Sequence, residues 1–249
     1  MRFTIPSETP SPEFISMWRA AGVHLQSFFE GGLQSWLKAN PHPPFLEHLS
    51  FILGNQVYFV RTEDVDDNVE VPGTRAGLRK IAEGWNGHAC LMPMLQTENG
   101  WRPVQEDWGL IDLRTNHPID PLTLATHEKI EVTDWELADF AVKVVRDWLV
   151  AEGRSIMSSQ SDPDVEPSIW FVGDEGPEWV IVRAARYPEK VAEIPDNWTS
   201  VARECAHLSH LGNFANVAFD CADNPGTPII RGEAAEAEFG GLQPLRWEG

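Results

Sequence analysis

The stretch that decides the fold is Ser168-Ile-Trp-Phe-Val172, the turn Gly173-Asp-Glu-Gly-Pro177 and the run Glu178-Trp-Val-Ile-Val-Arg183. Two runs of β-branched and aromatic residues flank a turn made of Gly, Asp and Pro, and this pattern predicts a β-hairpin. The hairpin places a sheet in the second half of the chain. No motif within it identifies a function.

The segments around this hairpin predict a mixed fold. Thr133 and Glu136 have the spacing of a capping box, which marks the start of a helix. Apolar residues recur at helical spacing from Leu137 to Leu149. A strand is expected over 155–160, a helix over 199–209 and a strand over 214–219. The order across 133–220 is therefore αβββαβ.

The first half has its own helix and strands. Ser11 and Pro12 predict a helix start, and the apolar stripe that follows continues to Phe29. A strand is expected over 55–60, and Thr74 is expected to cap a short helix. These elements predict a second centre of packing in the N-terminal region.

A second hairpin is expected in the first half. Asn99-Gly100 is a favoured two-residue turn between the strands at 88–95 and 101–104. Pro93 and Pro103 interrupt these strands, which predicts edge or bulged strands because proline lacks a backbone N–H. We therefore expect a small antiparallel sheet here.

The boundary between the halves is expected in the turn-rich stretch 115–121. This predicts an N-terminal α+β region over 1–120 and a C-terminal αβββαβ region over 121–249, and it leaves open whether the two share one core. No fixed-period repeat is visible. Leu53-Gly-Asn55 and Leu211-Gly-Asn213 each precede a strand, but three shared residues are too few to indicate duplication.

The order αβββαβ is similar to the core order of restriction-endonuclease-like nucleases, a likeness of fold alone. Those enzymes hold a divalent metal with an Asp near the second strand and an acid-x-Lys pair on the third. Asp164 or Asp174 could supply the first ligand. Matching Arg183 to the lysine puts Ile181 where the second ligand belongs, and an isoleucine cannot bind metal. Glu178 could replace it only after a shift in register.

The charge of the chain favours one class of partner. Asp and Glu number 38 against 19 Lys and Arg, which gives a net charge of −19. The basic residues are spread singly, so the surface is expected to repel a phosphate backbone, and nucleic-acid binding is disfavoured. A basic protein partner is permitted.

The cysteines and the apolar segments indicate a compartment. Cys90, Cys205 and Cys221 include no CxxC pair, which argues against a disulfide framework and for a reducing environment. The N-terminal residues lack the apolar segment of a signal peptide. No apolar run approaches the ~20 residues that a membrane helix needs. We therefore expect a cytoplasmic protein that does not enter a membrane.

Metal and cofactor motifs are incomplete. Glu204, His207 and His210 give one Glu-x-x-His, whereas a carboxylate-bridged site needs two. His88 and Cys90 supply two ligands where zinc takes three or four. Glycine pairs do not follow strands in a phosphate-binding pattern. The sequence predicts no cofactor and no metal.

Two hypotheses of different classes follow. The first is a non-enzymatic protein, of the immunity or regulatory type, that binds a basic protein through Trp108, Trp135 and Trp179 with the acidic residues Asp174 and Glu175. The alternative role for the indoles is to fill the core. The second is a metal-dependent nuclease or hydrolase that uses Asp164, Asp174, Glu178 and Arg183. Its carboxylates would have to converge within about 4–5 Å to share a hydrated cation.

Overall fold

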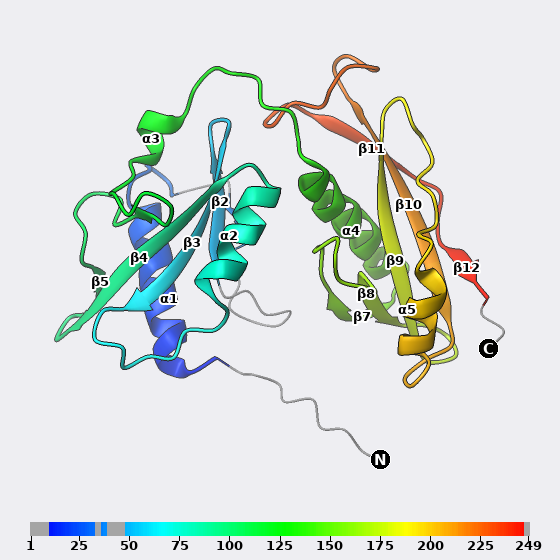
Figure 1. The fold of residues 1–249 in the computed structure, drawn as a ribbon, viewed down its shortest axis with the longest axis horizontal. Helices are drawn as coiled ribbons and strands as arrows, with labels where there is room; N and C mark the ends of the chain where they lie inside the picture. Colours follow the sequence, from blue (N-terminus) through cyan, green and yellow to red (C-terminus); the bar gives the residue numbers. More distant parts are fainter. Residues whose placement is uncertain (1–9, 33–35, 39–47, 247–249) are drawn as a thin grey trace. The chain divides into compact units, whose positions relative to one another are not determined.

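The computed structural model describes residues 10–32, 36–38 and 48–246. The chain divides into two compact units, Met1–Glu128 (unit 1) and Lys129–Gly249 (unit 2), so the division falls a few residues beyond the stretch 115–121. Each unit combines helices with a mixed β-sheet (Figure 1), and the fold is α+β.

Unit 1 has helix α1 on one face of its sheet and helix α2 on the other (Figure 1). Its elements are α1 (Pro12–Gln26), β1 (Trp36–Lys38), β2 (Leu49–Leu53), β3 (Gln56–Asp64), α2 (Arg75–Gly84), β4 (His88–Thr97), β5 (Gly100–Pro103), β6 (Ile111–Asp112) and α3 (Pro121–Leu124). The strand order is β1-β2-β3-β4-β5, and β6 also pairs with β4. Because β3 and β4 run parallel, the sheet is mixed, and the prediction of an antiparallel sheet was wrong.

The predicted helix starts of unit 1 are confirmed. The Ser11 hydroxyl accepts a hydrogen bond of 3.0 Å from the Phe14 N–H, and the Thr74 hydroxyl caps α2 in the same way. Helix α1 ends at Gln26, before the end of the apolar stripe. Beyond the helix, Phe28 stacks on Trp108 with ring centroids 4.3 Å apart. Phe28 is 37 % exposed, whereas Phe29 is partly buried against the core, so the apolar stripe reaches the core beyond the end of the helix.

Strand β4 lies inside the sheet, so of the predicted alternatives, an edge or a bulged strand, the edge was wrong for Pro93. Residues 90–91 of β4 pair with β6, and residues 94–97 pair with β5. Pro93 falls in the gap between these two pairings, where a missing N–H costs little. Strand β5 is an edge strand, as Pro103 predicted.

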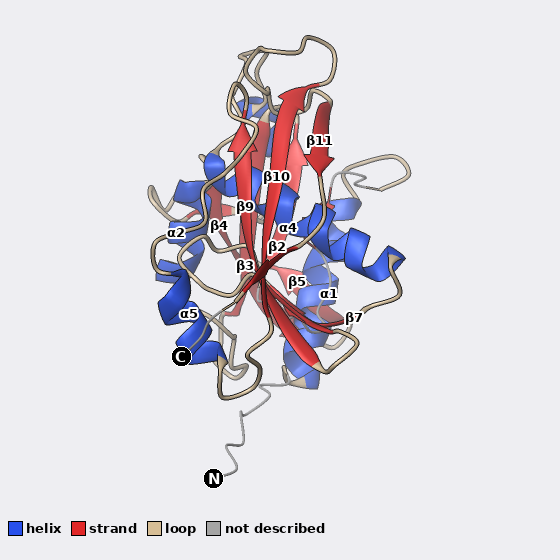
Figure 2. Ribbon diagram, turned by 90° about the vertical axis from the view of Figure 1, so that its right-hand side faces the viewer, coloured by secondary structure: helices blue, strands red, loops and turns tan. Residues whose placement is uncertain are grey.

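Unit 2 repeats this arrangement. Its elements are α4 (Asp134–Ala151), β7 (Ser155–Ser159), β8 (Ile169–Val172), β9 (Pro177–Arg186), α5 (Trp198–Cys205), β10 (Gly212–Cys221), β11 (Ala235–Phe239) and β12 (Gln243–Leu245). The strand order is β7-β8-β9-β10-β11, and β12 also pairs with β10. The parallel pair β9–β10 runs side by side over most of its length (Figure 2). The capping box of Thr133 and Glu136 is present, and the predicted order αβββαβ is observed.

The two units thus share one topology, an αβββαβββ order with a single parallel pair at its centre, and unit 1 adds the short helix α3 at its end. Their registers also correspond. Tyr58 pairs with His88 and Arg61 with Leu91, while Val180 pairs with Asn213 and Arg183 with Asn216, at the same spacing.

A repeated topology, which the sequence did not indicate, is therefore visible in the backbone. The two Leu-Gly-Asn segments are not its trace, because the first forms the β2–β3 turn and the second leads into β10.

Each unit has its own core. In unit 2, α4 covers one face of the sheet and contacts Val180, Val182 and Ala215. Helix α5 covers the other face and contacts Trp179, Ile181 and Phe214. Residues thus alternate between the two helices along β9, as the pleat of a strand requires. Among the described residues, no helix has the length and apolar character to cross a membrane.

Candidate functional site

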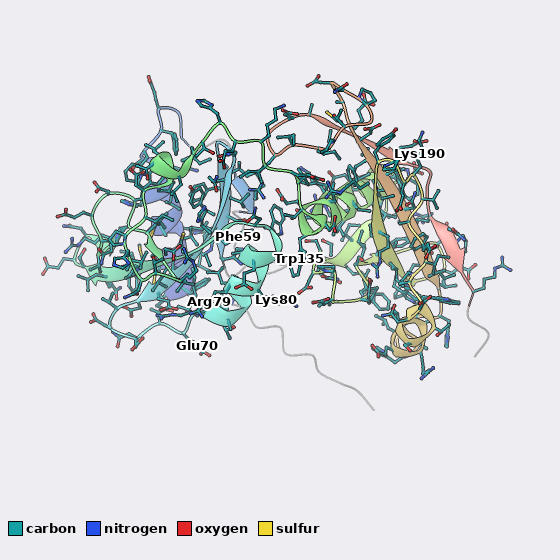
Figure 3. The ribbon with its side chains drawn as sticks, turned by 45° about the horizontal axis from the view of Figure 1, so that its top comes forward. Phe59, Glu70, Arg79, Lys80, Trp135 and Lys190 are labelled. Atoms are coloured by element: carbon teal, nitrogen blue, oxygen red, sulfur yellow. The ribbon has the colours of Figure 1, made fainter. Side chains whose placement is uncertain are left out.

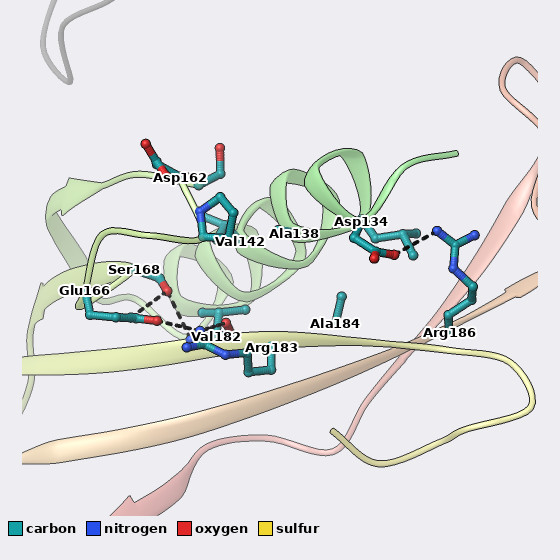
Figure 4. A pocket seen from close by; sticks show the side chains of 13 residues that line it. Asp134, Ala138, Val142, Asp162, Glu166, Ser168, Val182, Arg183, Ala184 and Arg186 are labelled. Carbon is teal, nitrogen blue, oxygen red and sulfur yellow. Dashed lines mark hydrogen bonds and ion pairs between the residues drawn. The ribbon is translucent and has the colours of Figure 1, made fainter. Parts of the chain in front are cut away.

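A cavity of about 320 Å³ opens in unit 2 beside the C-terminal half of β9 (Figure 4). It forms beyond the N-terminal end of β8, where the preceding loop, residues 160–168, lies beside β9 in place of the strand. Ser168 anchors this loop, because its N–H donates to the Val180 carbonyl at 2.9 Å and its hydroxyl accepts from the Val182 N–H at 3.1 Å. The loop therefore forms one wall, and α4 forms the opposite wall.

The lining of the cavity combines apolar side chains with ionisable ones. Leu137, Ala138 and Val142 come from α4, and Val182 and Ala184 come from β9. The ionisable side chains are those of Asp134, Asp162, Glu166, Arg183 and Arg186. A mostly apolar cavity with a few converging polar groups is the usual form of a binding site.

Glu166 is the most unusual of these side chains. Its side chain is only 9 % exposed, and Oε1 lies 2.5 Å from Arg183 Nη1. Arg183 balances the charge of Glu166, and its Nη1 also donates to the Val182 carbonyl at 2.8 Å. Across the described part of the chain, Oε1 accepts no hydrogen bond of good geometry. Burial raises the pKa of Glu166, although Arg183 and Ser168 act in the opposite direction.

Arg186 closes the far end of the cavity. Its guanidinium donates to Glu131 at 2.8 Å, to the Val132 carbonyl at 2.5 Å and to Asp134 at 3.1 Å. These contacts hold the start of α4 against β9, as Figure 4 shows for Asp134. Both arginines of the cavity are therefore already engaged with carboxylates and main-chain carbonyls.

The equivalent arginine of unit 1 is covered by the chain itself. Arg61 donates to Glu63 at 2.8 Å, to the Pro72 carbonyl at 2.5 Å and to the Val71 carbonyl at 3.1 Å, and it is 8 % exposed. Those carbonyls belong to the connection between β3 and α2.

In unit 2 the corresponding connection, between β9 and α5, is held by Asn216 of β10, the residue that pairs with Arg183 in the register. Asn216 accepts from the Ala192 N–H and donates to the Lys190 carbonyl. The Arg183 side chain consequently keeps 28 % of its surface exposed. The space beside this arginine is therefore covered by main-chain carbonyls in unit 1, whereas in unit 2 the arginine stays partly exposed.

The residues of the nuclease hypothesis have other partners. Asp174 forms an ion pair with Arg154, in which Nη2 lies 2.8 Å from Oδ2, and Glu178 accepts from Asn213 at 2.9 Å. The charge of Glu178 also acts on Arg154. A guanidinium thus lies where two of the carboxylates come near each other. Asp164 lies in the loop 160–168, where its N–H donates to Asp162.

The ligand position predicted at Ile181 is in the core. Ile181 is fully buried against α5. Over residues 10–32, 36–38 and 48–246, no three His, Cys, Asp or Glu side chains are grouped as metal ligands. The predicted Glu204, His207 and His210 do not share a helix, since α5 ends at Cys205. Nothing in this arrangement favours a metal-dependent reaction.

The tryptophans predicted to face a partner have different environments. Trp108 is 3 % exposed and Trp179 is 1 % exposed, so both belong to cores and do not form a surface. Trp135 is half-buried at the second residue of α4 (Figure 3). Asp174 and Glu175 are exposed in the β8–β9 turn. Of the predicted partner-facing residues, these two acids and Trp135 remain accessible.

The sequence did not point to Glu166, because it lies in a turn-rich loop without a recognisable motif. Arg183 was noticed only as a substitute for a catalytic lysine. Glu166 and Arg183 meet because Ser168 holds the loop against β9. This contact joins residues far apart in the sequence, so no local pattern indicates it.

A pH-dependent prediction follows from Glu166. Since its pKa is raised in the folded state, its ionisation opposes folding. The stability contributed by the protonated form is complete below the pKa of the unfolded chain, about 4.3, and is lost as the pH rises through the folded pKa. We expect the stability of Glu166→Gln, relative to wild type, to increase as the pH is raised above about 4.3.

Amide exchange of the core strands β9 and β10 at a series of pH values measures this difference. Glu175→Gln, which removes one exposed charge, is the control. A difference between Glu166→Gln and wild type that does not change with pH would contradict the prediction.

The comparisons with known proteins concern unit 2. Residues 135–245 match the model of a domain of unknown function, DUF8840. No curated protein and no solved structure matches the chain.

Proposed function

We propose that this chain is a non-enzymatic binding protein, of the immunity or regulatory type, that recognises a basic protein partner through unit 2. The observation that carries the proposal is the acidic edge of the second sheet. Strand β11 is an edge strand, and its Glu236 and Glu238 are exposed. Glu236 lies directly opposite Asp220 of β10 in the register.

This pairing of like charges favours a cationic partner. Like charges directly opposite on neighbouring strands destabilise a sheet, and a bound cation relieves the repulsion. In the part of the chain that the structure describes, neither Glu236 nor Glu238 forms an ion pair, although Lys129 pairs with Glu233 at 3.1 Å. Acidic residues on an edge strand also discourage pairing of sheets with one another, and this role is compatible with binding.

A synthetic decalysine peptide tests the location of the surface. We expect Glu236→Lys/Glu238→Lys to weaken its binding about tenfold in calorimetry at low salt, because two attractions become repulsions of up to about 1 kcal/mol each. Asp66→Lys/Asp67→Lys changes the net charge equally in an exposed loop of unit 1 and should have a much smaller effect. Equal losses in both double variants would show that only net charge matters.

The native partner provides the second test. Capture by the wild-type chain should yield a stoichiometric basic protein at low salt, and added salt should weaken the complex because rim charges are screened. The double variant at β11 should fail to retain that protein. Absence of any stoichiometric partner at low salt would overturn the proposal.

We also propose that unit 2 is a degenerate relative of the restriction-endonuclease-like core. Its αβββαβ order supports this, as do the helices on opposite faces of a sheet with one parallel pair. The buried Ile181 at the ligand position supports a core that serves recognition without bond cleavage.

A further inference from the structure

We propose that the cavity between α4, the loop 160–168 and β9 receives one lysine or arginine side chain of the partner. This inference rests on the proposed function and names the chemical group that unit 2 recognises. It depends on the shape of the cavity, on an unsatisfied buried carboxylate oxygen and on the comparison between the two units.

The shape suits a side chain with an aliphatic stem and a charged end. The volume of about 320 Å³ lies at the lower end for ligand sites, which favours a side chain over a large cofactor. Leu137, Ala138 and Ala184 offer apolar surface for methylene groups, and the carboxylates of Asp134, Asp162 and Glu166 also line the cavity. Lysine and arginine bury their stems against such walls while the charge reaches polar groups.

The unsatisfied polar group is an acceptor. Oε1 of Glu166 is buried, and its ion pair of 2.5 Å with Nη1 of Arg183 leaves it without a hydrogen bond of good geometry among the described residues, so this carboxylate can still accept hydrogen bonds. An ammonium or guanidinium group brings donors and charge together, which makes the strong type of hydrogen bond. An anion would meet Glu166, Asp134 and Asp162, and the two arginines already face carboxylates. The cavity therefore selects a cation.

In unit 1 the chain itself covers the arginine that corresponds to Arg183. There the carbonyls of Val71 and Pro72 close over Arg61. In unit 2 the corresponding connection is held by Asn216, and Arg183 pairs with Glu166 at the open cavity. The fold thus has room for other groups beside this arginine, and in unit 2 the side chain of the partner takes that place.

The test uses the full chain and three small probes. Nα-acetyl-lysine methylamide and Nα-acetyl-arginine methylamide carry the cation, and Nα-acetyl-norleucine methylamide carries an uncharged stem. We expect the cationic probes to shift the amide resonances of Ala138 and Ala184 saturably, with a Kd in the millimolar range, equivalent to about −4 kcal/mol. Norleucine should bind at least about fivefold more weakly, since it lacks the charge-assisted hydrogen bond.

Two variants of different kinds keep the test decisive. Glu166→Gln removes the carboxylate and should weaken the cationic probes several-fold. Ala138→Phe fills the cavity and should abolish the shifts without changing charge. Asp66→Asn, in unit 1, removes a charge equally and should leave binding unchanged.

The outcomes separate the inference from the function on which it rests. Equal binding of norleucine and lysine, unchanged binding in Glu166→Gln, or tighter binding of acetate at the same resonances would overturn the inference. If decalysine still binds through Glu236 and Glu238 in that case, the proposed function stands without the cavity. If decalysine binding does not depend on β11 while the probes bind in the cavity, the proposal that the acidic edge is the binding surface is wrong, and the inference about the cavity stands.

Discussion

Replacing Glu136 with alanine is expected to destabilise unit 2 by about 3–5 kcal/mol, because it leaves a buried arginine without its counter-charge. Arg231 Nε and Nη2 donate to the two carboxylate oxygens of Glu136, each at 2.8 Å. The two side chains are 1 % and 0 % exposed. Glu136 also accepts from the Thr133 N–H at 2.9 Å, so the start of α4 loses its capping box as well.

Chemical denaturation followed by amide exchange in β9 and β10 measures this loss. Asp147→Ala, on the same helix but in an exposed pair with Arg146, should change stability by no more than about 1 kcal/mol. The double variant Glu136→Leu/Arg231→Met removes both charges and should be more stable than Glu136→Ala. A loss below about 1 kcal/mol in Glu136→Ala, the range of exposed pairs, would contradict the burial of this pair.

Replacing Gly212 with alanine is expected to cost about 3 kcal/mol, the upper end of the range for overpacked cores. The added Cβ would lie 2.1 Å from Cζ2 of Trp179 and 2.4 Å from its Cη2. Trp179 has little room to move, since it is 1 % exposed and its indole N–H donates to the Ser209 carbonyl at 3.3 Å. The first residue of β10 must therefore be glycine as long as position 179 is tryptophan.

A second substitution tests the cause. Trp179→Phe removes part of the ring that the new Cβ would strike, so Gly212→Ala should cost less in that background than in wild type. Gly22→Ala in α1 is the matched control, because its Cβ would meet only Leu49 at 3.9 Å and a helical alanine is favoured by roughly 0.5–1 kcal/mol. Additive changes in the free energy of unfolding at positions 179 and 212 would show that the new Cβ and the Trp179 ring do not clash.

The local structure was largely predictable from short-range chemistry. Ser11, Thr74 and Thr133 marked their helices correctly because an N-cap needs only a side-chain oxygen and an adjacent free N–H. The hairpins at 99–100 and 173–177 were found because turn residues separate β-forming runs. These signals act within a few residues, and the sequence displays them directly.

Strands β11 and β12 were missed for the opposite reason. Ala235-Glu-Ala-Glu-Phe239 has poor β-forming residues, and the strand exists because β10 offers an unpaired edge. The repeated topology was missed because few residue identities are shared between the units, Arg61 and Arg183 being one of them. Tyr58 and Val180 occupy the same position, and so do Leu91 and Asn216.

The candidate site could not be predicted, because Glu166 and Arg183 meet only when a loop lies along a strand. The sequence did predict the two properties on which the proposed function depends. They are the excess of negative charge and the apolar residue at position 181.

The pair of Glu136 and Arg231 also has a consequence for synthesis of the chain. The partners are 95 residues apart, so the carboxylate is made long before its guanidinium leaves the ribosome. At about 5–20 residues per second, the nascent chain waits roughly 5–20 s for this contact. Until then the beginning of α4 must stay hydrated, and the second unit closes only after Arg231 has been translated.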